Sequence, residues 1–529
     1  DTMASTNRAP VYSRNGVVAA SQPLAVSAGI EILQRGGSAV DAAIAVSAVL
    51  AVVEPGASHL GGGAFVINYD ARAKTVTAFN GSGEAPHTAT PSAYVDGIPL
   101  HGYKSATVPG LVSTWFAAHD EYGVLAMDEI LQAAIEYAEN GFPANTGFVR
   151  RIAHHLKQFP GTELFQQLEI DTNLKVGDLV IQKQLAESLL TIADEGRSAF
   201  YEGWIAEEFV TATQGWFSLE DLAAHRTRVL PPLTVPYRDL YIHGQPPPSQ
   251  GMILMEELRI ADGFELASMS EADRIHLMVE AKKLAFEDRY RILGDPEYID
   301  IDLDQILGNS HIATRRSQID MKNADTTHKR YPSEGNDTTY FLVADRDGNA
   351  VSWIQSVFHG FGASWAIPNT GIILNNRLTG FSLHEHSPNL IAPGKRPAHT
   401  LNAWIATRKD GSLALVGGTP GANIQVQTNF QLIVNAVDLG MNPQQNAEAP
   451  RWQHLAKSSS SEIENFDGVL QIEKRVDYAT IADLKERGHE VHELSEYGHG
   501  SAVQLLEVTP DGTFIAGSDP RAEGHAAGI

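Results

Sequence analysis

The stretch "EGNDTTYFLVADRDGNAVSW" (334–353) is the most informative part of this chain. A polar, turn-prone run ends at Asp337, the pair Thr338-Thr339 follows, and alternating apolar residues then lead to an Asp-Gly pair. Alternation of this kind is typical of a strand. Asp-Gly between two apolar runs is a strong signal for a hairpin. The stretch therefore predicts a β-hairpin whose first strand opens with two threonines.

A threonine at the start of a strand can carry covalent chemistry. Its hydroxyl is a poor nucleophile unless a base lies beside it, and one solution uses the threonine's own α-amino group, freed by cutting the preceding peptide bond. That amine titrates near neutral pH and can accept the hydroxyl proton. The layout fits a cut between Asp337 and Thr338. The alternative is two β-branched residues that merely open a strand, and this stretch taken alone favours that alternative.

Composition excludes several classes of function. The chain has 529 residues with 43% hydrophobic content, enough for a large core, and its net charge of −25 argues against a nucleic-acid partner. The absence of cysteine excludes disulfides, thiolate nucleophiles and cysteine metal sites. The most apolar run, 42–53, is too short to span a bilayer, and the start "DTMASTNRAP" lacks a signal-peptide pattern. We expect no membrane partner and a cytoplasmic location, with a periplasmic or secreted one left open for a trimmed chain.

The rest of the chain predicts helices first and strands later. Helical spacing covers 24–35, an Ala-rich helix opened by Asp41 ends before Glu54, and 272–293 reads as an amphipathic helix. Residues 61–79 read as two strands around a turn, and further Asp-Gly hairpins are expected at 410–411 and 511–512. Helices interleaved with strand-rich segments favour layered sheets covered by helices.

Other motifs do not support competing chemistry. Gly61–Gly63 lacks both the G-x-G-x-x-G spacing and the Gly-Lys-Ser/Thr of a phosphate loop, so a tightly packed turn is the better interpretation. "HEH" (384–386) and "HEVHE" (489–493) do not match H-E-x-x-H and are expected to be solvated. No G-x-S-x-G elbow occurs. We expect neither a metal ion nor a cofactor.

The chain resembles the γ-glutamyltranspeptidase family of N-terminal-nucleophile hydrolases over nearly its whole length. Each matching segment is weak alone, but ten occur in the family's order. They are "RGGSAVDAA" (35–43), "VVEPGASHLGGGAF" (52–65), "PPPSQG" (246–251), "EAKKLAFEDR" (280–289), "DTTYFLVADRDGNAVS" (337–352), "GIILNNRLTGFS" (371–382), "PGKRP" (393–397), "GGTPGANIQ" (417–425), "EAPRW" (448–452) and "SDPR" (518–521).

The resemblance implies an α+β fold, a four-layer αββα sandwich forming one globular unit. It implies a proenzyme that cuts itself between Asp337 and Thr338. Residues 1–337 would form the large subunit and 338–529 the small subunit, interlocked with each other. A further homo-oligomer is left open.

Site roles follow from the same resemblance. Thr338 matches the nucleophile, and Ser356 stands where the family has a supporting threonine hydroxyl. Gly421 and Ala422 match a Gly-Gly pair whose backbone N–H groups form the oxyanion hole, and alanine keeps the N–H. The expected reaction is acyl transfer from a small-molecule amide to water or an amine.

The substrate clamp departs from the family pattern. "NGSGEAPH" (80–87) lacks the arginine that grips the glutamyl carboxylate, and Arg377 and Gly380 replace a Gln or Glu and an acidic residue. His399 and Thr400 replace a serine pair, and Phe358 replaces an asparagine.

A substrate ammonium beside Arg377 would be costly to bury. We therefore expect an acyl group that bears a carboxylate without the α-amino group, such as a glutaryl- or oxamate-type amide. The residues expected to contact it are Thr339, Asn376, Arg377, His399 and Thr400.

Several alternatives stay open at this stage. The sequence supports equally well an Arg377 that points away from the pocket and pairs with a surface acid, and an Arg377 that faces the pocket. Classical glutathione hydrolysis remains a candidate function, as do a metal-dependent amidase and a non-catalytic relative that never matures.

Overall fold

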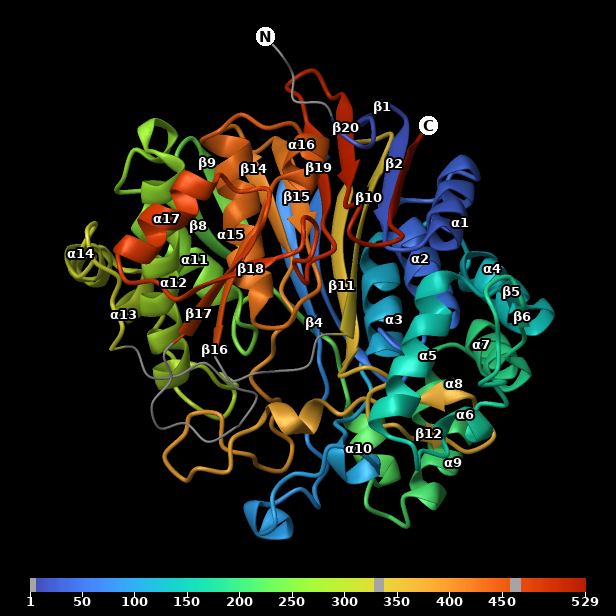
Figure 1. Cartoon of the computed structure of the whole chain (residues 1–529). Coiled ribbons are helices and arrows are strands. Elements are labelled where there is room, and N and C mark those ends of the chain that lie inside the picture. Colours follow the sequence, from blue (N-terminus) through green and yellow to red (C-terminus); the bar gives the residue numbers. More distant parts are fainter. Residues whose placement is uncertain (1–5, 328–336, 457–467) are drawn as a thin grey trace.

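The computed structural model describes residues 6–327, 337–456 and 468–529. Within them, two seven-stranded antiparallel sheets are flanked by helices (Figure 1). This confirms the expected α+β class with layered sheets. Among the residues described, no helix combines the length and apolar character needed to cross a bilayer.

One sheet, here the β10 sheet, contains the opening stretch near its centre. Its strands, in spatial order, are β21 (His525–Gly528), β2 (Gly16–Ala20), β10 (Asp337–Asp345), β11 (Ala350–Phe358), β3 (Gly63–Asp70), β4 (Thr75–Gly81) and β7 (Arg228–Leu230).

The second sheet, here the β15 sheet, packs against the first. Its order is β1 (Val11–Ser13), β20 (Phe514–Ser518), β19 (Gln504–Val508), β15 (Leu413–Gly418), β14 (Trp404–Arg408), β9 (Leu240–Gly244) and β8 (Leu233–Tyr237). Both sheets thus combine strands from before and after residue 338.

Alternation along β10 builds two cores at once. Tyr340, Leu342 and Ala344 lie in the apolar core between the sheets. Phe341 and Val343 lie in the core formed with the helices on the other face. Because successive strand side chains point to opposite faces, a fully apolar strand suits a sheet covered on both sides.

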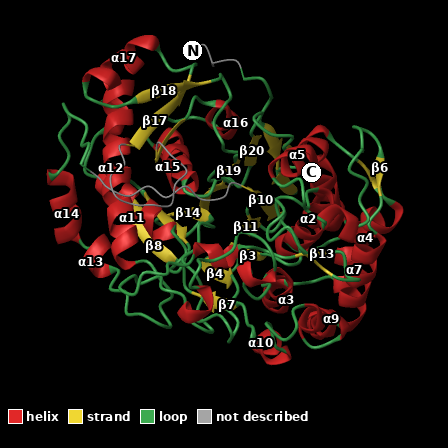
Figure 2. Ribbon diagram, turned by 60° about the horizontal axis from the view of Figure 1, so that its bottom comes forward, coloured by secondary structure: helices red, strands yellow, loops and turns green. Residues whose placement is uncertain are grey.

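Helices of the first half of the chain cover the β10 sheet (Figure 2). They are α1 (Pro23–Gln34), α2 (Ala39–Val53), α3 (Leu111–Tyr122), α4 (Met127–Asn140), α5 (Thr146–Gln158), α6 (Leu164–Gln167), α7 (Lys183–Glu195), α8 (Arg197–Tyr201), α9 (Trp204–Ala212) and α10 (Leu219–Ala224). All residues of α2 are buried, and the capping box of Ser38 with Asp41 begins it, so Asp41 supports the cap rather than being the cap residue.

Another group of helices lies on the β15 side and includes α11, α12 and α15, which line its core. The group is α11 (Gly251–Ala261), α12 (Glu271–Ile292), α13 (Asp304–Leu307), α14 (Asn309–Ser317), α15 (Ile424–Val437), α16 (Pro443–Glu448) and α17 (Tyr478–Glu486). The expected amphipathic character of α12 was wrong, because its charged residues Glu280, Lys282 and Lys283 are buried with its apolar ones.

Short strands complete the described structure. They are β5 (Phe142–Pro143), β6 (Leu179–Val180), β12 (Ala366–Ile367), β13 (Ile372–Ile373), β16 (Trp452–Ala456), β17 (Gly468–Glu473) and β18 (Val491–Leu494).

All three expected Asp-Gly hairpins are confirmed. They join β10 to β11, β14 to β15 and β19 to β20. Their glycines, Gly348, Gly411 and Gly512, have φ values of 86°, 83° and 87°. Glycine adopts this left-handed region without steric cost, which explains the turn sequence.

Candidate active site

Thr338 is the second residue of β10 and is buried at an irregularity of the sheet. Asp337 pairs with Phe358 and Thr339 with Gln355, so Thr338 alone lies opposite two residues of β11, one of which is Ser356. A bulge of this kind locally redirects side chains and is common beside active sites.

A chain of hydrogen bonds links Thr338 to the peptide bond that precedes it. The Thr338 hydroxyl donates to Ser356 Oγ at 3.0 Å, and Ser356 Oγ donates to the carbonyl oxygen of Asp337 at 2.8 Å. The Phe358 N–H also donates to Ser356 Oγ, at 2.8 Å. Ser356 therefore contacts both the hydroxyl and the carbonyl of the expected cleavage site.

The glycine run 61–63 packs against this site. A Cβ on Gly62 would lie 2.3 Å from the Ser356 carbonyl oxygen, and one on Gly61 only 1.9 Å from that of Ile373. Such distances exclude any side chain at these two positions. The interpretation as a tightly packed turn is confirmed.

Gly421 and Ala422 lie in the turn that follows β15. That strand ends at Gly418, where a Cβ would lie 2.3 Å from the ring of Tyr340, so the turn begins close to the start of β10. The φ values of Gly421 and Ala422 are 130° and 50°. In the orientation of the Gln425 amide that gives both its oxygen and its nitrogen a hydrogen-bond partner, the oxygen accepts from the Ala422 N–H at 3.3 Å. Gln425 would therefore compete with a substrate oxyanion for this N–H. The oxyanion role of the pair stays a prediction.

Arg377 is buried rather than solvated, at 4% exposure. Its guanidinium donates to Thr400 Oγ1 at 3.1 Å and lies 3.8 Å from the centre of the Phe358 ring, a cation–π contact. Burial excludes the alternative in which Arg377 points to the surface.

His399 lies beside this arginine in the neutral form. Burial, aided by the charges of Arg377 and Arg396, lowers the pKa of His399 well below its ordinary value. Its Nδ1 accepts from the Leu401 N–H at 3.3 Å, which places the imidazole proton on Nε2. Phe358, Arg377, His399 and Thr400 are called the arginine cluster below.

Phe358 connects Ser356 to Arg377. Its N–H contacts Ser356 and its ring contacts Arg377, while its φ of 86° is unusual for a bulky residue. Sequence reasoning noted Phe358 only as a replaced asparagine and could not detect this geometry.

Asn376 and Thr339 were also expected to contact the substrate, but both form contacts within the protein. The amide of Asn376 donates to the Leu100 carbonyl at 3.1 Å and accepts from the His359 N–H at 3.1 Å. Thr339 Oγ1 lies 2.6 Å from Ser21 Oγ. Their role toward a substrate stays a prediction.

Two charged residues near the expected cleavage site were missed. Arg151, on α5, lies with Nε 3.7 Å from the Asp337 carboxylate and donates to Glu54 at 3.1 Å. Glu54 lies in the quoted segment "VVEPGASHLGGGAF", but no local pattern pointed to Arg151.

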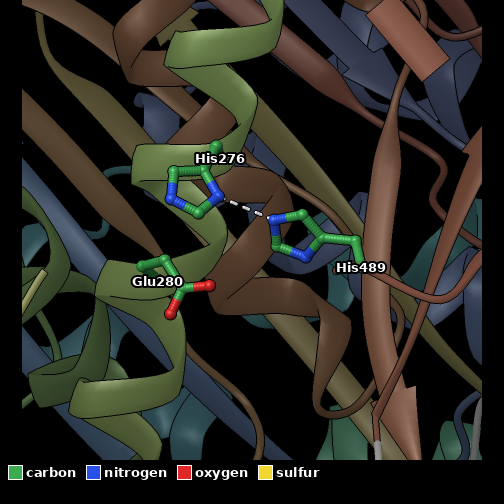
Figure 3. A group of neighbouring side chains, drawn as sticks. All are labelled: His276, Glu280 and His489. Carbon is green, nitrogen blue, oxygen red and sulfur yellow. Dashed lines mark hydrogen bonds between the residues drawn. The ribbon is translucent and has the colours of Figure 1, made fainter. Parts of the chain in front are cut away.

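A histidine group forms away from the nucleophile (Figure 3). His276 and Glu280, one turn apart on α12, meet His489, and their ligand atoms lie within 4.8 Å of one another. His489 is buried, so its expected solvation was wrong, whereas "HEH" (384–386) is exposed as expected. Burial lowers the pKa of His489 to about 3.

These three residues could hold a metal ion, but they also bond to protein groups. The two imidazoles contact each other at 2.7 Å, and the Lys283 ammonium lies 2.9 Å from Glu280. A second group, Glu256, Asp288 and His311, is likewise accompanied by a cation, because Arg315 donates to Asp288 at 2.9 Å. In both groups a protein cation already balances carboxylate charge.

Comparison with known proteins identifies the family. The gamma-glutamyltranspeptidase family profile matches residues 25–529. The glutathione hydrolase-like YwrD proenzyme of Bacillus subtilis (strain 168) is 36% identical over 98% of this chain and 99% of its own length. The oxamate amidohydrolase proenzyme of Klebsiella pneumoniae is 34% identical, with the same two shares. The crystal structure of a cephalosporin acylase from Bacillus halodurans is 31% identical, with a TM-score of 0.90 over 100% of this chain and 98% of that one. The chain belongs to the gamma-glutamyltranspeptidase family of N-terminal-nucleophile hydrolases.

Proposed function

We propose that this protein is a self-processing amidohydrolase that cuts its own chain between Asp337 and Thr338. The single observation that carries the proposal is the hydrogen-bond chain from Thr338 Oγ1 through Ser356 Oγ to the Asp337 carbonyl oxygen. It joins the attacking hydroxyl, a proton carrier and the carbonyl that must be attacked. Of the three proteins compared above, two are named as proenzymes and one as an acylase, which agrees with this chemistry.

The cut begins with attack of Thr338 Oγ1 on the Asp337 carbonyl carbon. Ser356 Oγ takes the threonine proton while giving its own to the carbonyl oxygen, so no charge accumulates. Collapse of the adduct breaks the C–N bond while the hydroxyl proton of the adduct passes to the leaving nitrogen, which frees the α-amine of Thr338 and leaves an ester between Asp337 and Thr338 Oγ1. Water hydrolyses that ester, which frees the Thr338 hydroxyl and leaves a carboxyl group on Asp337.

The products would be a large subunit of residues 1–337 and a small subunit of 338–529, interlocked in a four-layer αββα sandwich. Both sheets support this, because β10 and β11 lie between β2 and β3, and β15 lies among strands of both parts. Separation of the two subunits would break the β2–β10 and β11–β3 ladders of the β10 sheet and the β1–β20 and β14–β9 ladders of the β15 sheet, so they stay together after the cut.

In the mature enzyme the freed amine serves as the base for a second acyl transfer. It accepts the Thr338 hydroxyl proton as Oγ1 attacks the substrate amide. The N–H groups of Gly421 and Ala422 would stabilise the oxyanion. The amine product leaves with the transferred proton, and water or another amine then releases the acyl group.

The acyl group is proposed to carry a carboxylate but no α-amino group, as in glutaryl- or oxamate-type amides. The buried guanidinium of Arg377 supports this, because a charge-assisted bond to a carboxylate offsets the cost of holding the cation away from water. Neutral His399 can donate from Nε2 without adding charge, and Thr339 and Asn376 complete the proposed contacts.

A second candidate is classical glutathione hydrolysis, favoured by the likeness to a protein named glutathione hydrolase-like. Turnover of a glutaryl anilide and of a γ-glutamyl anilide, measured at equal concentration, distinguishes the two candidate functions. Preference for the glutaryl compound supports the altered clamp, and preference for the γ-glutamyl compound supports the second candidate.

The proposal is tested by the intact mass under denaturing conditions. The wild type should give two fragments divided between Asp337 and Thr338, and Thr338→Ala should give one chain with turnover lower by on the order of 10⁴-fold or more. One uncut wild-type chain would overturn the proposal and favour the non-maturing alternative.

A further inference from the structure

Five side chains form a nearly closed ring around the Asp337–Thr338 bond. The Ser21 hydroxyl donates to Glu54, so the hydroxyl of Thr339 is the donor in its 2.6 Å contact with Ser21. The other oxygen of Glu54 accepts from Arg151 at 3.1 Å. The Nε of the same guanidinium lies 3.7 Å from the Asp337 carboxylate. The ring therefore runs from Thr339, which follows the bond, to Asp337, which precedes it.

The three intermediate residues are attached to rigid parts of the fold. Ser21 directly follows β2, the strand that pairs with β10, and Glu54 ends α2 as its C-terminal cap residue. Arg151 lies in the middle of α5. Positions fixed by buried elements can hold a flexible peptide more accurately than loop residues can.

A glycine beside Asp337 is consistent with a defined place for its carboxylate. A Cβ on Gly360 would lie 2.5 Å from Asp337 Oδ2, so a side chain there would displace the carboxylate from Arg151. The negative charges of Asp337 and Glu54 raise the pKa of Arg151 against the opposing effect of burial. One guanidinium therefore serves two carboxylates that would otherwise repel each other.

We propose that Arg151, Glu54 and Ser21 are positioning residues for self-cleavage, holding the chain on both sides of the bond. The ring anchors Asp337 through its carboxylate and Thr339 through its hydroxyl. Rotation of the peptide between these anchors is thereby restricted, and the Asp337 carbonyl stays on Ser356 Oγ. Restricting reactants to a near-attack geometry is a large source of rate acceleration. This inference rests on the proposed function, since it concerns the same bond.

The test follows self-cleavage during cell-free synthesis, as the fraction of full-length chain against time. Arg151→Ala, Glu54→Gln and Asp337→Ala should each slow cleavage by about 10- to 100-fold. Arg150→Ala is the matched control, because Arg150 is the exposed neighbour on the same helix. It should cleave at the wild-type rate.

Two further measurements separate positioning from a loss of folding. The double variant Arg151→Ala with Asp337→Ala should cleave no more slowly than the slower single variant, because both remove one interaction. Guanidinium at about 10–50 mM, well below denaturing concentrations, should restore part of the rate to Arg151→Ala. It should do nothing for Thr338→Ala.

The outcomes distinguish this inference from the proposed function. If the wild type cleaves, Thr338→Ala does not, and the Arg151 and Glu54 variants cleave at the wild-type rate, the ring has no positioning role. The inference would also be overturned if Arg151→Ala cleaves slowly but its loss of rate adds to that of Asp337→Ala and guanidinium does not restore it. If the wild type itself does not cleave, the proposed function fails.

Discussion

The candidate nucleophile Thr338 and its partner Ser356, here the nucleophile pair, meet the arginine cluster at Phe358, yet the two groups are assembled differently. The pair comes from one hairpin and its members are 18 residues apart. The cluster brings the end of β11 together with the short helix at 377–380 and the segment before β14. The first is set by one ladder of backbone hydrogen bonds, and the second by how separate loops pack.

This difference gives a physical reason for the expectation that one region keeps the family pattern while the other departs from it. A change in the register of β10 would move Thr338 to the other face of the sheet and disrupt the cores on both sides. A change among the cluster side chains alters only the loops that carry them. The hairpin is thus constrained by the fold, whereas the cluster is free to fit a different acyl group.

The largest effect in the comparison is expected at the nucleophile pair. Ser356→Ala should slow self-cleavage by about 10²–10³-fold, because the transfer of the Thr338 proton to the Asp337 carbonyl oxygen loses its carrier. The rate is read from a cell-free time course. Ser356→Thr keeps the hydroxyl and should stay within about tenfold of wild type, and an alanine variant that cleaves normally would show that Ser356 is dispensable.

A smaller effect is expected in the arginine cluster. Arg377→Ala should lower kcat/KM for a glutaryl anilide by about 10–100-fold, because a charge-assisted hydrogen bond of about 1.5–3 kcal/mol is lost. A pentanoyl anilide, equal in chain length but uncharged, should change by less than about threefold. Arg346→Ala, on the exposed turn between β10 and β11, is the control. Equal losses for both anilides would contradict a carboxylate contact.

The stability of the protein should depend on pH through the buried residue His59. Burial lowers the pKa of His59 to about 3, and its Nδ1 accepts from the Ile373 N–H at 3.0 Å. Below pH 6.5 the unfolded chain binds a proton that the folded chain refuses, so stability falls as the pH falls. At pH 5 the loss from this group is about 2 kcal/mol.

Urea unfolding of the uncut Thr338→Ala chain at pH 7 and pH 5 measures this loss. Adding His59→Gln, which keeps an acceptor for the Ile373 N–H, should make the free energy of unfolding less dependent on pH by a similar amount. An unchanged pH dependence would mean that His59 is protonated in the folded chain.

The smallest effect is expected in the turn after β15. Ala422→Gly should stabilise the protein by about 0.5 kcal/mol, because relief of the left-handed backbone of alanine exceeds the entropy cost of glycine. This corresponds to about 1 °C in Tm. Turnover should stay within about twofold, since the backbone N–H is retained. A tenfold loss of turnover would assign a role to the alanine methyl group instead.

The local elements could be predicted because short-range interactions determine them. Helix α2 follows from its Ala-rich run and capping box, and the three hairpins follow from Asp-Gly between apolar runs. The hairpin turn at 347–348 also places Thr338 close to Ser356 across the ladder. The resemblance to the family had pointed to both residues, and the hairpin explains why they lie together.

The contacts between distant segments were decided by the tertiary structure. His276 and His489 are 213 residues apart, and Arg151 reaches Asp337 from a helix with no recognisable motif. The burial of Arg377 and of the charged residues of α12 likewise depends on which elements cover them. Periodicity and turn chemistry act between neighbours in the chain, so the sequence by itself determined the strands, the hairpins and the nucleophile pair. Only the packing of the two sheets and their helices decided which charges meet at the cleavage site and in the arginine cluster, because such contacts depend on the whole core rather than on any local pattern.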